Sequence, residues 1–236
     1  MRQARKLAIF DLDYTLTAKG TWGRFTARCM KGHAWRWPEL ALRAVGMQAA
    51  YKLGLVPRIA VKTQMMRVCM TGRERAELEA IAEGFAEDEV ARGLRPGGVA
   101  VLRAHQEAGD RVMIASAAVD VLVAPIARGL GVEDWVATEM AWDGEGGDPR
   151  PTDTLSDHFA SPNCYGAAKL AAVEAHFARD PAWLKPGETF ITMYSDSSSD
   201  VDLFTLADDA VAVHPSAKLR RMAENLGWRV VEWNAG

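Results

Sequence analysis

The chain has 236 residues, of which 49% are hydrophobic and 25% are charged, with a formal net charge of -3. This size and apolar content predict a globular protein, either one domain or a domain with an insertion, and exclude a disordered chain. The first apolar run, 7–10, is ended by Asp11 and is far shorter than the core of a signal peptide. No disulfide framework or zinc spacing is formed by the cysteines, Cys29, Cys69 and Cys164. We therefore expect a cytoplasmic protein.

The chain begins with a predicted buried strand, LAIF at 7–10, which is followed at once by two carboxylates in DLDYTLT. Side chains alternate along an extended chain, so Asp11 and Asp13 should point to the same side, where their charges repel each other. A positive group is therefore expected beside them.

Four helices are predicted next, each bounded by glycine or proline. Pro38 and Pro57 lie near the starts of two of them, and Gly32 and Gly54 follow the ends of two. The predicted ranges are 21–31, 38–53, 57–70 and 74–91. Residues 18–91 are thus expected to form a small all-helical unit.

The distribution of charged residues along the sequence sets apart nearly the same segment as the predicted helical unit. Residues 18–73 contain eleven Lys or Arg and one acid, Glu39, a formal charge of +10, which leaves -13 on the remainder. Such an asymmetry indicates two surfaces with different partners.

From Pro96 onward, predicted helices and strands alternate to the end of the chain. This order predicts a parallel sheet with crossover helices, an α/β, Rossmann-like core of three layers. We expect a discontinuous core of residues 1–17 and 92–236, with the helical cap 18–91 inserted after the first strand. The acidic, glycine-rich stretch 143–159 is expected to be a hairpin or flap.

Further polar groups follow the ends of predicted strands. Ser116 closes RVMIAS, Asp196 and Asp200 lie in SDSSSD after TFITMYS, and Lys169 begins a helix after NCYG. Ligands of an open parallel sheet bind at the carboxyl ends of its strands, so these groups should converge with Asp11. Carboxylates from two strand ends suit Mg²⁺ together with a substrate phosphate, and an ionised aspartate is a ready nucleophile. The pattern predicts phosphoryl transfer.

Four segments, DLDYTLT, MIASA, NCYGAAKL and YSDSSSDVDLF, resemble in order the motifs of the haloacid dehalogenase (HAD) superfamily. The helical insertion resembles the subfamily of phosphoserine phosphatases and phosphatidylglycerophosphatase C. The resemblance implies an aspartyl-phosphate mechanism in which Asp11 is the nucleophile and Asp13 the general acid and base. It also implies phosphate contacts from Ser116, Lys169 and Ser199, and a Mg²⁺ site formed by Asp11, Asp13, Asp196 and Asp200.

Two departures from that subfamily concern the substrate. Phosphoserine phosphatases commonly have GDGxND, whereas Ser199 here replaces the asparagine, which weakens one phosphate contact. They also have a glutamate nine residues after the nucleophile, for the ammonium of serine, and that position is Gly20. The resemblance therefore favours an anionic small-molecule or lipid-head phosphate over phosphoserine.

Each residue also has an ordinary structural interpretation. Taken singly, an acidic pair after a strand is a common turn, Ser116 a backbone-bonded hydroxyl, Lys169 a solvated helix residue and Asp200 a helix N-cap. Three functions remain: a Mg²⁺-dependent phosphomonoester hydrolase, with phosphoserine phosphatase as the alternative; a phosphotransferase; and a non-catalytic module whose basic cap binds anionic lipid or nucleic acid. Retention of every charged position argues against the last, and nucleic acid ranks lowest. No feature indicates an oligomeric state.

The remaining hypothesis concerns what the surface of the helical cap contacts. Arg24, Arg28 and Lys31 are predicted to share one helix face, and the helix 38–53 is apolar nearly all round. Its charges exclude a membrane span, which needs about 18 or more apolar residues. One interpretation is a small bundle with solvated basic residues. The other is an interfacial cap that contacts anionic lipid at the inner membrane face.

Overall fold

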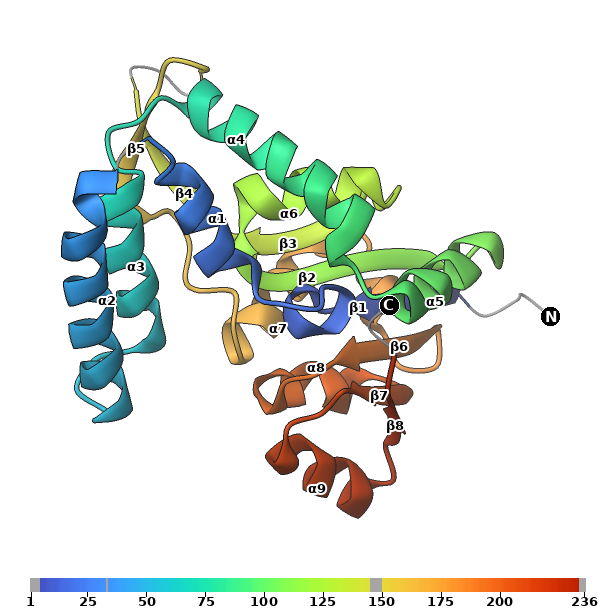
Figure 1. Cartoon of the computed structure of the whole chain (residues 1–236). Coiled ribbons are helices and arrows are strands. Elements are labelled where there is room, and N and C mark those ends of the chain that lie inside the picture. The colour runs from blue at the N-terminus through green and yellow to red at the C-terminus, as the bar shows by residue number, and fades with distance from the viewer. Residues whose placement is uncertain (1–4, 33, 145–149, 234–236) are drawn as a thin grey trace.

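The core of the computed structural model, which describes residues 5–32, 34–144 and 150–233, is a parallel sheet of six strands (Figure 1). The strand order is β3-β2-β1-β6-β7-β8. The strands are β1 (Arg5–Phe10), β2 (Arg111–Val119), β3 (Asp134–Thr138), β6 (Thr189–Ser195), β7 (Asp209–Val213) and β8 (Arg229–Val231). Because β1 lies in the middle, it is buried on both faces and is apolar from Leu7 to Phe10.

Helices cover both faces of this sheet. Ala8 and Phe10 of β1 pack in one buried cluster with α5 (Pro96–Glu107) and α6 (Asp120–Gly129). Leu7 and Ile9 pack in a second cluster with α7 (Ala167–His176), α8 (Val201–Leu206) and α9 (Ala217–Leu226). A short 3-10 helix, Pro181–Leu184, precedes β6, and another, Ser198–Asp200, precedes α8. The predicted three-layer α/β fold is confirmed.

The segment between β1 and β2 begins with a helical lobe. It contains α1 (Thr21–Cys29), α2 (Trp37–Lys52), α3 (Arg58–Cys69) and α4 (Arg75–Asp88), with short helical turns at Ala34–Arg36 and Glu89–Gly93. Pro38 in the first turn of α2 and Pro57 directly before α3 fix where these two helices begin. Helices α2 and α3 lie side by side at the edge of the molecule, away from the sheet (Figure 1). No helix of the described ranges is long and apolar enough to cross a membrane.

A two-stranded antiparallel hairpin packs with this helical lobe. It consists of β4 (Met140–Asp143) and β5 (Thr154–Phe159), and residues 145–149 of the expected flap lie outside the described part. Gly72 donates a backbone hydrogen bond of 2.8 Å to Leu155, and Arg75 one of 2.8 Å to Asp153. Leu155 is buried in one cluster with Phe25, Met66 and Leu78 of the lobe. The lobe therefore packs with a strand pair from outside residues 18–91, which the expected all-helical unit did not include. The domain boundaries stay a prediction.

The basic face expected on α1 is not an open surface. Arg24 forms an ion pair with the buried Glu89, and the Arg28 guanidinium lies 2.5 Å from the Asp88 carboxylate. Both acids lie at the end of α4 or directly after it, and α1 packs against α4. Arg24 and Arg28 are therefore ion-paired within the lobe, and the expectation that they face an anionic partner stays a prediction.

Candidate active site

The site lies where β1, β2 and β6 end, which are neighbours in the sheet. Asp11 directly follows β1, and its backbone nitrogen donates a 2.9 Å hydrogen bond to Tyr194 of β6. Asp196 directly follows β6. Ser116 lies near the end of β2, where the pairing with β3 shifts register between Ala115 and Val119. The sheet thus brings together three segments far apart in the sequence.

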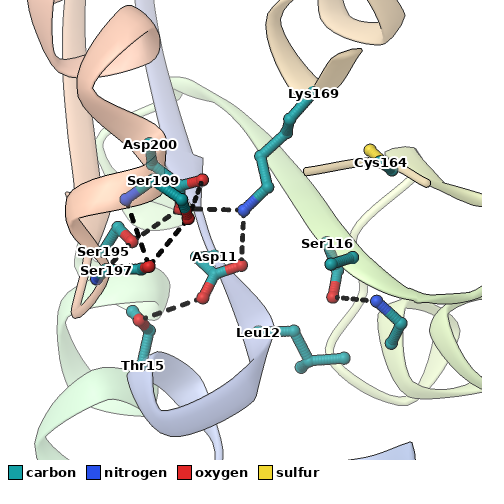
Figure 2. A network of polar contacts seen from close by, with 12 residues as sticks. Asp11, Leu12, Thr15, Ser116, Cys164, Lys169, Ser195, Ser197, Ser199 and Asp200 are labelled. Atoms are coloured by element: carbon teal, nitrogen blue, oxygen red, sulfur yellow. Dashed lines mark hydrogen bonds and ion pairs between the residues drawn. The ribbon is translucent and has the colours of Figure 1, made fainter. Parts of the chain in front are cut away.

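Lys169 supplies the positive group that was expected beside Asp11. Its ammonium donates 2.8 Å hydrogen bonds to Asp11 Oδ1 and to Asp200 Oδ2, and all three residues are buried (Figure 2). Ser195 also donates to Asp200 Oδ2, at 2.7 Å. Asp11, Lys169 and the acidic segment after β6 therefore form one hydrogen-bonded network.

Thr15 connects Asp11 to Asp196. Its hydroxyl accepts a 3.0 Å hydrogen bond from the Asp196 backbone nitrogen, and its oxygen lies 3.4 Å from Asp11 Oδ2 and 3.4 Å from Asp196 Oδ1. Thr15 itself is fully buried. The two carboxylates consequently converge on one hydroxyl from two different strands.

The turn after β1 sets the position of Asp13. Residues Leu12–Leu16 form a wide, π-type turn that is interrupted at Asp13 and Tyr14 by non-helical dihedral angles. Tyr14 has a φ of 63°, a left-handed conformation that is uncommon for tyrosine. Asp13 Oδ1 accepts a 2.8 Å hydrogen bond from the backbone nitrogen of Thr21, at the start of α1. Burial raises the pKa of Asp13, although the hydrogen bonds from Thr21 lower it. The turn thus separates Asp13 from the lysine network and presents it toward the helical lobe.

Two predicted phosphate-binding hydroxyls have other partners in this structure. Ser116 is buried, and its oxygen accepts a 3.0 Å hydrogen bond from Ala118, which leaves its proton to donate. The Ser199 hydroxyl lies 2.7 Å from that of Ser197 and 3.5 Å from Asp200 Oδ1 (Figure 2). Ser199 therefore contacts the residues around Asp200, and neither serine is bonded to Asp11.

The charges of the site are strongly coupled. Burial raises the pKa of Asp11 to about 7; Lys169 lowers it, and Asp200 and Asp196 raise it. Burial likewise raises the pKa of Asp196 to about 6, helped by Asp200. Burial alone would lower the pKa of Lys169, but its contacts with Asp11 and Asp200 outweigh that effect and raise it. Lys169 is therefore charged, and it compensates only part of the negative charge around it.

This excess of negative charge is what a hard divalent cation would neutralise. The oxygen donors available are the carboxylates of Asp11 and Asp196 and the backbone carbonyl of Asp13. No group of three or more His, Cys, Asp or Glu side chains in the described ranges forms a ready metal cage. Mg²⁺ keeps several waters and is usually bound through one or two carboxylates plus substrate phosphate, so this donor set fits it.

A pocket of about 370 Å³ opens beside Asp13, between the core and the helical lobe. Its walls include Trp22, Gln48, Tyr51, Lys62 and Asn163. The Lys62 ammonium donates a 2.6 Å hydrogen bond to the carbonyl of Ala117 and lies over the rings of Trp22 and Phe159. Substrate atoms beyond the phosphate would thus meet aromatic and neutral polar groups and one cation.

Comparison with known proteins identifies the family. The model of haloacid dehalogenase-like hydrolases matches residues 8–205. The chain belongs to this family. A phosphoserine phosphatase, SerB1 of Mycobacterium tuberculosis H37Rv, is 27% identical over 94% of this chain and 69% of its own length. A histidinol-phosphatase of Neisseria meningitidis serogroup C is 25% identical over 97% of this chain and 99% of its own.

A solved structure supports the fold. The crystal structure of a protein of unknown function from Bordetella pertussis Tohama I has a TM-score of 0.84 and 26% identity, covering 98% of this chain and 100% of that one. The HAD resemblance and the prediction of a hydrolase are confirmed, and two of the curated relatives of this HAD hydrolase are named phosphatases.

Sequence analysis missed three residues that shape the site of this HAD hydrolase. Thr15 lies four residues after Asp11 within the DLDYTLT motif, and Ser195 directly precedes Asp196, so both were visible beside the predicted carboxylates. A hydroxyl at a strand end next to an aspartate was the available signal. Lys62 has no such signal, because only the docking of α3 against the core brings it to Ala117.

Proposed function

We propose that the protein is a Mg²⁺-dependent phosphomonoester hydrolase that acts through an aspartyl phosphate on Asp11. The observation that carries this proposal is the buried Lys169 ammonium, which is bonded to both Asp11 and Asp200. Positioning and charge neutralisation are what phosphoryl transfer requires of a protein. The names of the two relatives support a phosphatase.

In the first step, an Asp11 carboxylate oxygen forms a bond to phosphorus while the ester P–O bond breaks. The leaving oxygen takes a proton from Asp13, whose raised pKa suits a general acid. In the second step, Asp13 removes a proton from water, and the water oxygen bonds to phosphorus. The bond between Asp11 and phosphorus then breaks and inorganic phosphate leaves, which restores both carboxyl groups.

The surrounding residues hold these groups in place. Lys169 lies where it can contact a phosphoryl oxygen as well as Asp11, and Ser116 has a proton to donate to another. Asp11, Asp196 and the Asp13 carbonyl would hold Mg²⁺, which when bound would offset the charge of the carboxylates and the phosphate. Asp200 orients Lys169, and we retain a phosphate contact for Ser199 only as a prediction.

The pocket beside Asp13 guides the choice of substrate. Lys62 is the cation of its wall, and Gly20 stands at the position where a glutamate would bind the ammonium of phosphoserine. A β-carbon at Gly20 would lie 3.1 Å from the Tyr14 hydroxyl, so a longer side chain there would have to displace Tyr14. We therefore propose an anionic small-molecule or lipid-head phosphate, ahead of phosphoserine.

The test is a Mg²⁺ assay of phosphate release from a panel that includes phosphoserine, histidinol phosphate and lipid phosphates. Asp11→Asn should lose turnover while keeping its unfolding transition, and beryllofluoride with Mg²⁺ should label the parent at Asp11. An active Asp11→Asn variant, or an adduct on another residue, would contradict the mechanism. Transfer of phosphate to an added alcohol in place of water would identify a phosphotransferase.

A further inference from the structure

Large apolar side chains are exposed on one part of the molecule. Of the ten exposed large hydrophobic residues in the described ranges, seven lie between residues 35 and 55, in α2 or at its ends. Six of them define what we call the α2 surface: Trp35, Trp37, Leu42, Val45, Leu53 and Leu55. Leu42 and Leu53 are 77% and 74% exposed, and α2 buries only Leu40. Such a concentration marks an interaction surface.

The position of α2 leaves this surface accessible. Helix α2 packs on α3, and it forms the outermost edge of the molecule, far from α9 (Figure 1). Gln48 and Tyr51 of the same helix line the pocket beside Asp13. A partner on the α2 surface would therefore lie close to the entrance of the candidate active site.

Charge indicates which partner fits. Lys52 is exposed on α2 beside the apolar residues, whereas Arg43 is ion-paired with Glu39 of the same helix. Residues 18–73 carry a formal charge of +10, of which four cations are paired with acids outside the segment, so the segment remains positive. A second copy meeting this surface through a two-fold axis would bring two such positive segments together, which costs free energy. An anionic bilayer offers instead both negative head groups and an apolar interior. Tryptophan is also enriched at the level of lipid head groups, and Trp35 and Trp37 lie at the start of α2.

We propose that the α2 surface docks the protein peripherally on anionic lipid bilayers. Leu42 and Val45, one turn apart, would enter the head-group region with α2 parallel to the membrane plane, and Lys52 would contact lipid phosphates. This contact differs from the one expected at Arg24 and Arg28, which are paired within the lobe. It does not depend on the proposed catalytic activity, since binding is measured without turnover.

The experiment is sedimentation of the full chain with vesicles of phosphatidylcholine, with and without phosphatidylglycerol. We expect binding to the anionic vesicles that weakens as salt rises. Leu42→Ser with Val45→Ser should reduce the partition coefficient at least about tenfold, because apolar burial is lost. Lys52→Gln should reduce it about fivefold at low salt, the contribution of one basic residue near an anionic surface.

The matched control is Leu226→Ser, which removes a 58% exposed leucine on α9, away from the α2 surface, and should bind as the parent does. The proposal is overturned if the parent does not bind anionic vesicles or if the double α2 variant binds them equally well. A further measurement is sedimentation velocity without lipid. A parent dimer that the double variant abolishes, with no vesicle binding, would assign the α2 surface to a second copy of this chain.

Discussion

The Lys62 ammonium, on α3 of the helical lobe, donates a 2.6 Å hydrogen bond to the Ala117 carbonyl, one residue after Ser116 at the end of β2. The bond joins the helical lobe to the core directly beside the pocket that Asp13 lines. Lys62 also lowers the pKa of Asp13 through its charge, against the larger effect of burial. One side chain thus contributes to the position of the lobe, the charge of the pocket and the acidity of Asp13, the proposed general acid.

Replacing Lys62 should therefore impair catalysis more than folding. Charge-assisted hydrogen bonds contribute about 1.5–3 kcal/mol, so Lys62→Met should lower kcat/KM by about 10- to 100-fold. Steady-state kinetics on the preferred ester measure the effect, and urea unfolding checks that the variant is folded. Thr63→Ala is the control, because that hydroxyl bonds only to Ile59 of its own helix, at 3.0 Å. Equal losses in both variants would count against a role for the ammonium.

Asp196→Asn should weaken Mg²⁺ binding and activity together. The substitution replaces a charged oxygen ligand by a neutral one, and we expect the affinity for Mg²⁺ to fall at least about tenfold. Calorimetric titration of the protein with Mg²⁺ measures this without turnover. Asp202→Asn, six residues further along in α8, should bind Mg²⁺ as the parent does. Normal affinity in Asp196→Asn would show that Asp196 is not a ligand.

Thr15 should act as a positioning residue. Thr15→Val keeps the shape of the side chain but removes the hydroxyl between Asp11 and Asp196, so Mg²⁺ affinity should fall about 10- to 100-fold, as for other groups that orient ligands. Thr15→Ser restores a hydroxyl and should recover most of that loss. If the serine variant were as defective as the valine variant, packing of the threonine methyl group, and not the hydroxyl, would explain the effect.

Asp120 should make stability depend on pH. Burial raises its pKa to about 6, while its carboxylate accepts hydrogen bonds from Val121 and Met140. A carboxyl group whose pKa is higher in the folded state favours folding when protonated, so this contribution is lost as pH rises from about 4 to 6. Asp120→Asn keeps an acceptor without the charge and should raise the free energy of unfolding by about 2 kcal/mol at neutral pH.

Urea unfolding of the parent and Asp120→Asn at pH 4 and pH 7.5 checks this expectation. The two proteins should differ at the higher pH and converge at the lower one. Asp120→Ala, which also removes the acceptor, should be less stable than Asp120→Asn at both pH values. A parent that is more stable than Asp120→Asn at neutral pH would contradict the prediction.

The sequence predicted the parts of the site that depend on strand ends. Asp11 and Asp196 each directly follow a strand whose apolar run stops at a polar residue. The alternation of side chains along each strand and the order of the strands in the sheet then determine where the two carboxylates meet. Lys169 was predicted to neutralise these acids, and it does contact Asp11. Its bond to Asp200 follows from the same edge of the sheet, because α7 packs against the turn Ser198–Asp200 that comes after β6.

The parts that could not be predicted depend on how the lobe packs. Arg24 and Arg28 share a helix face, which the period of α1 shows, but their partners Glu89 and Asp88 are about 60 residues away in the chain. Lys62 and Ala117 likewise meet only through the contact between lobe and core. Charge along a sequence indicates a surface, but it does not show which of the charges another helix covers.

The β4–β5 hairpin limits how this enzyme could exchange its lobe with that of a relative. Residues 72–76 of the lobe and residues 151–155, which lead into β5, lie far apart in the sequence. They share four backbone hydrogen bonds of 2.8–2.9 Å. A chimera that replaced residues 18–91 alone would leave the foreign segment without the partner strand that its edge was selected to match. Recombination that preserves the fold would have to transfer both stretches together, so new specificities should arise here more readily by substitution than by swapping whole segments.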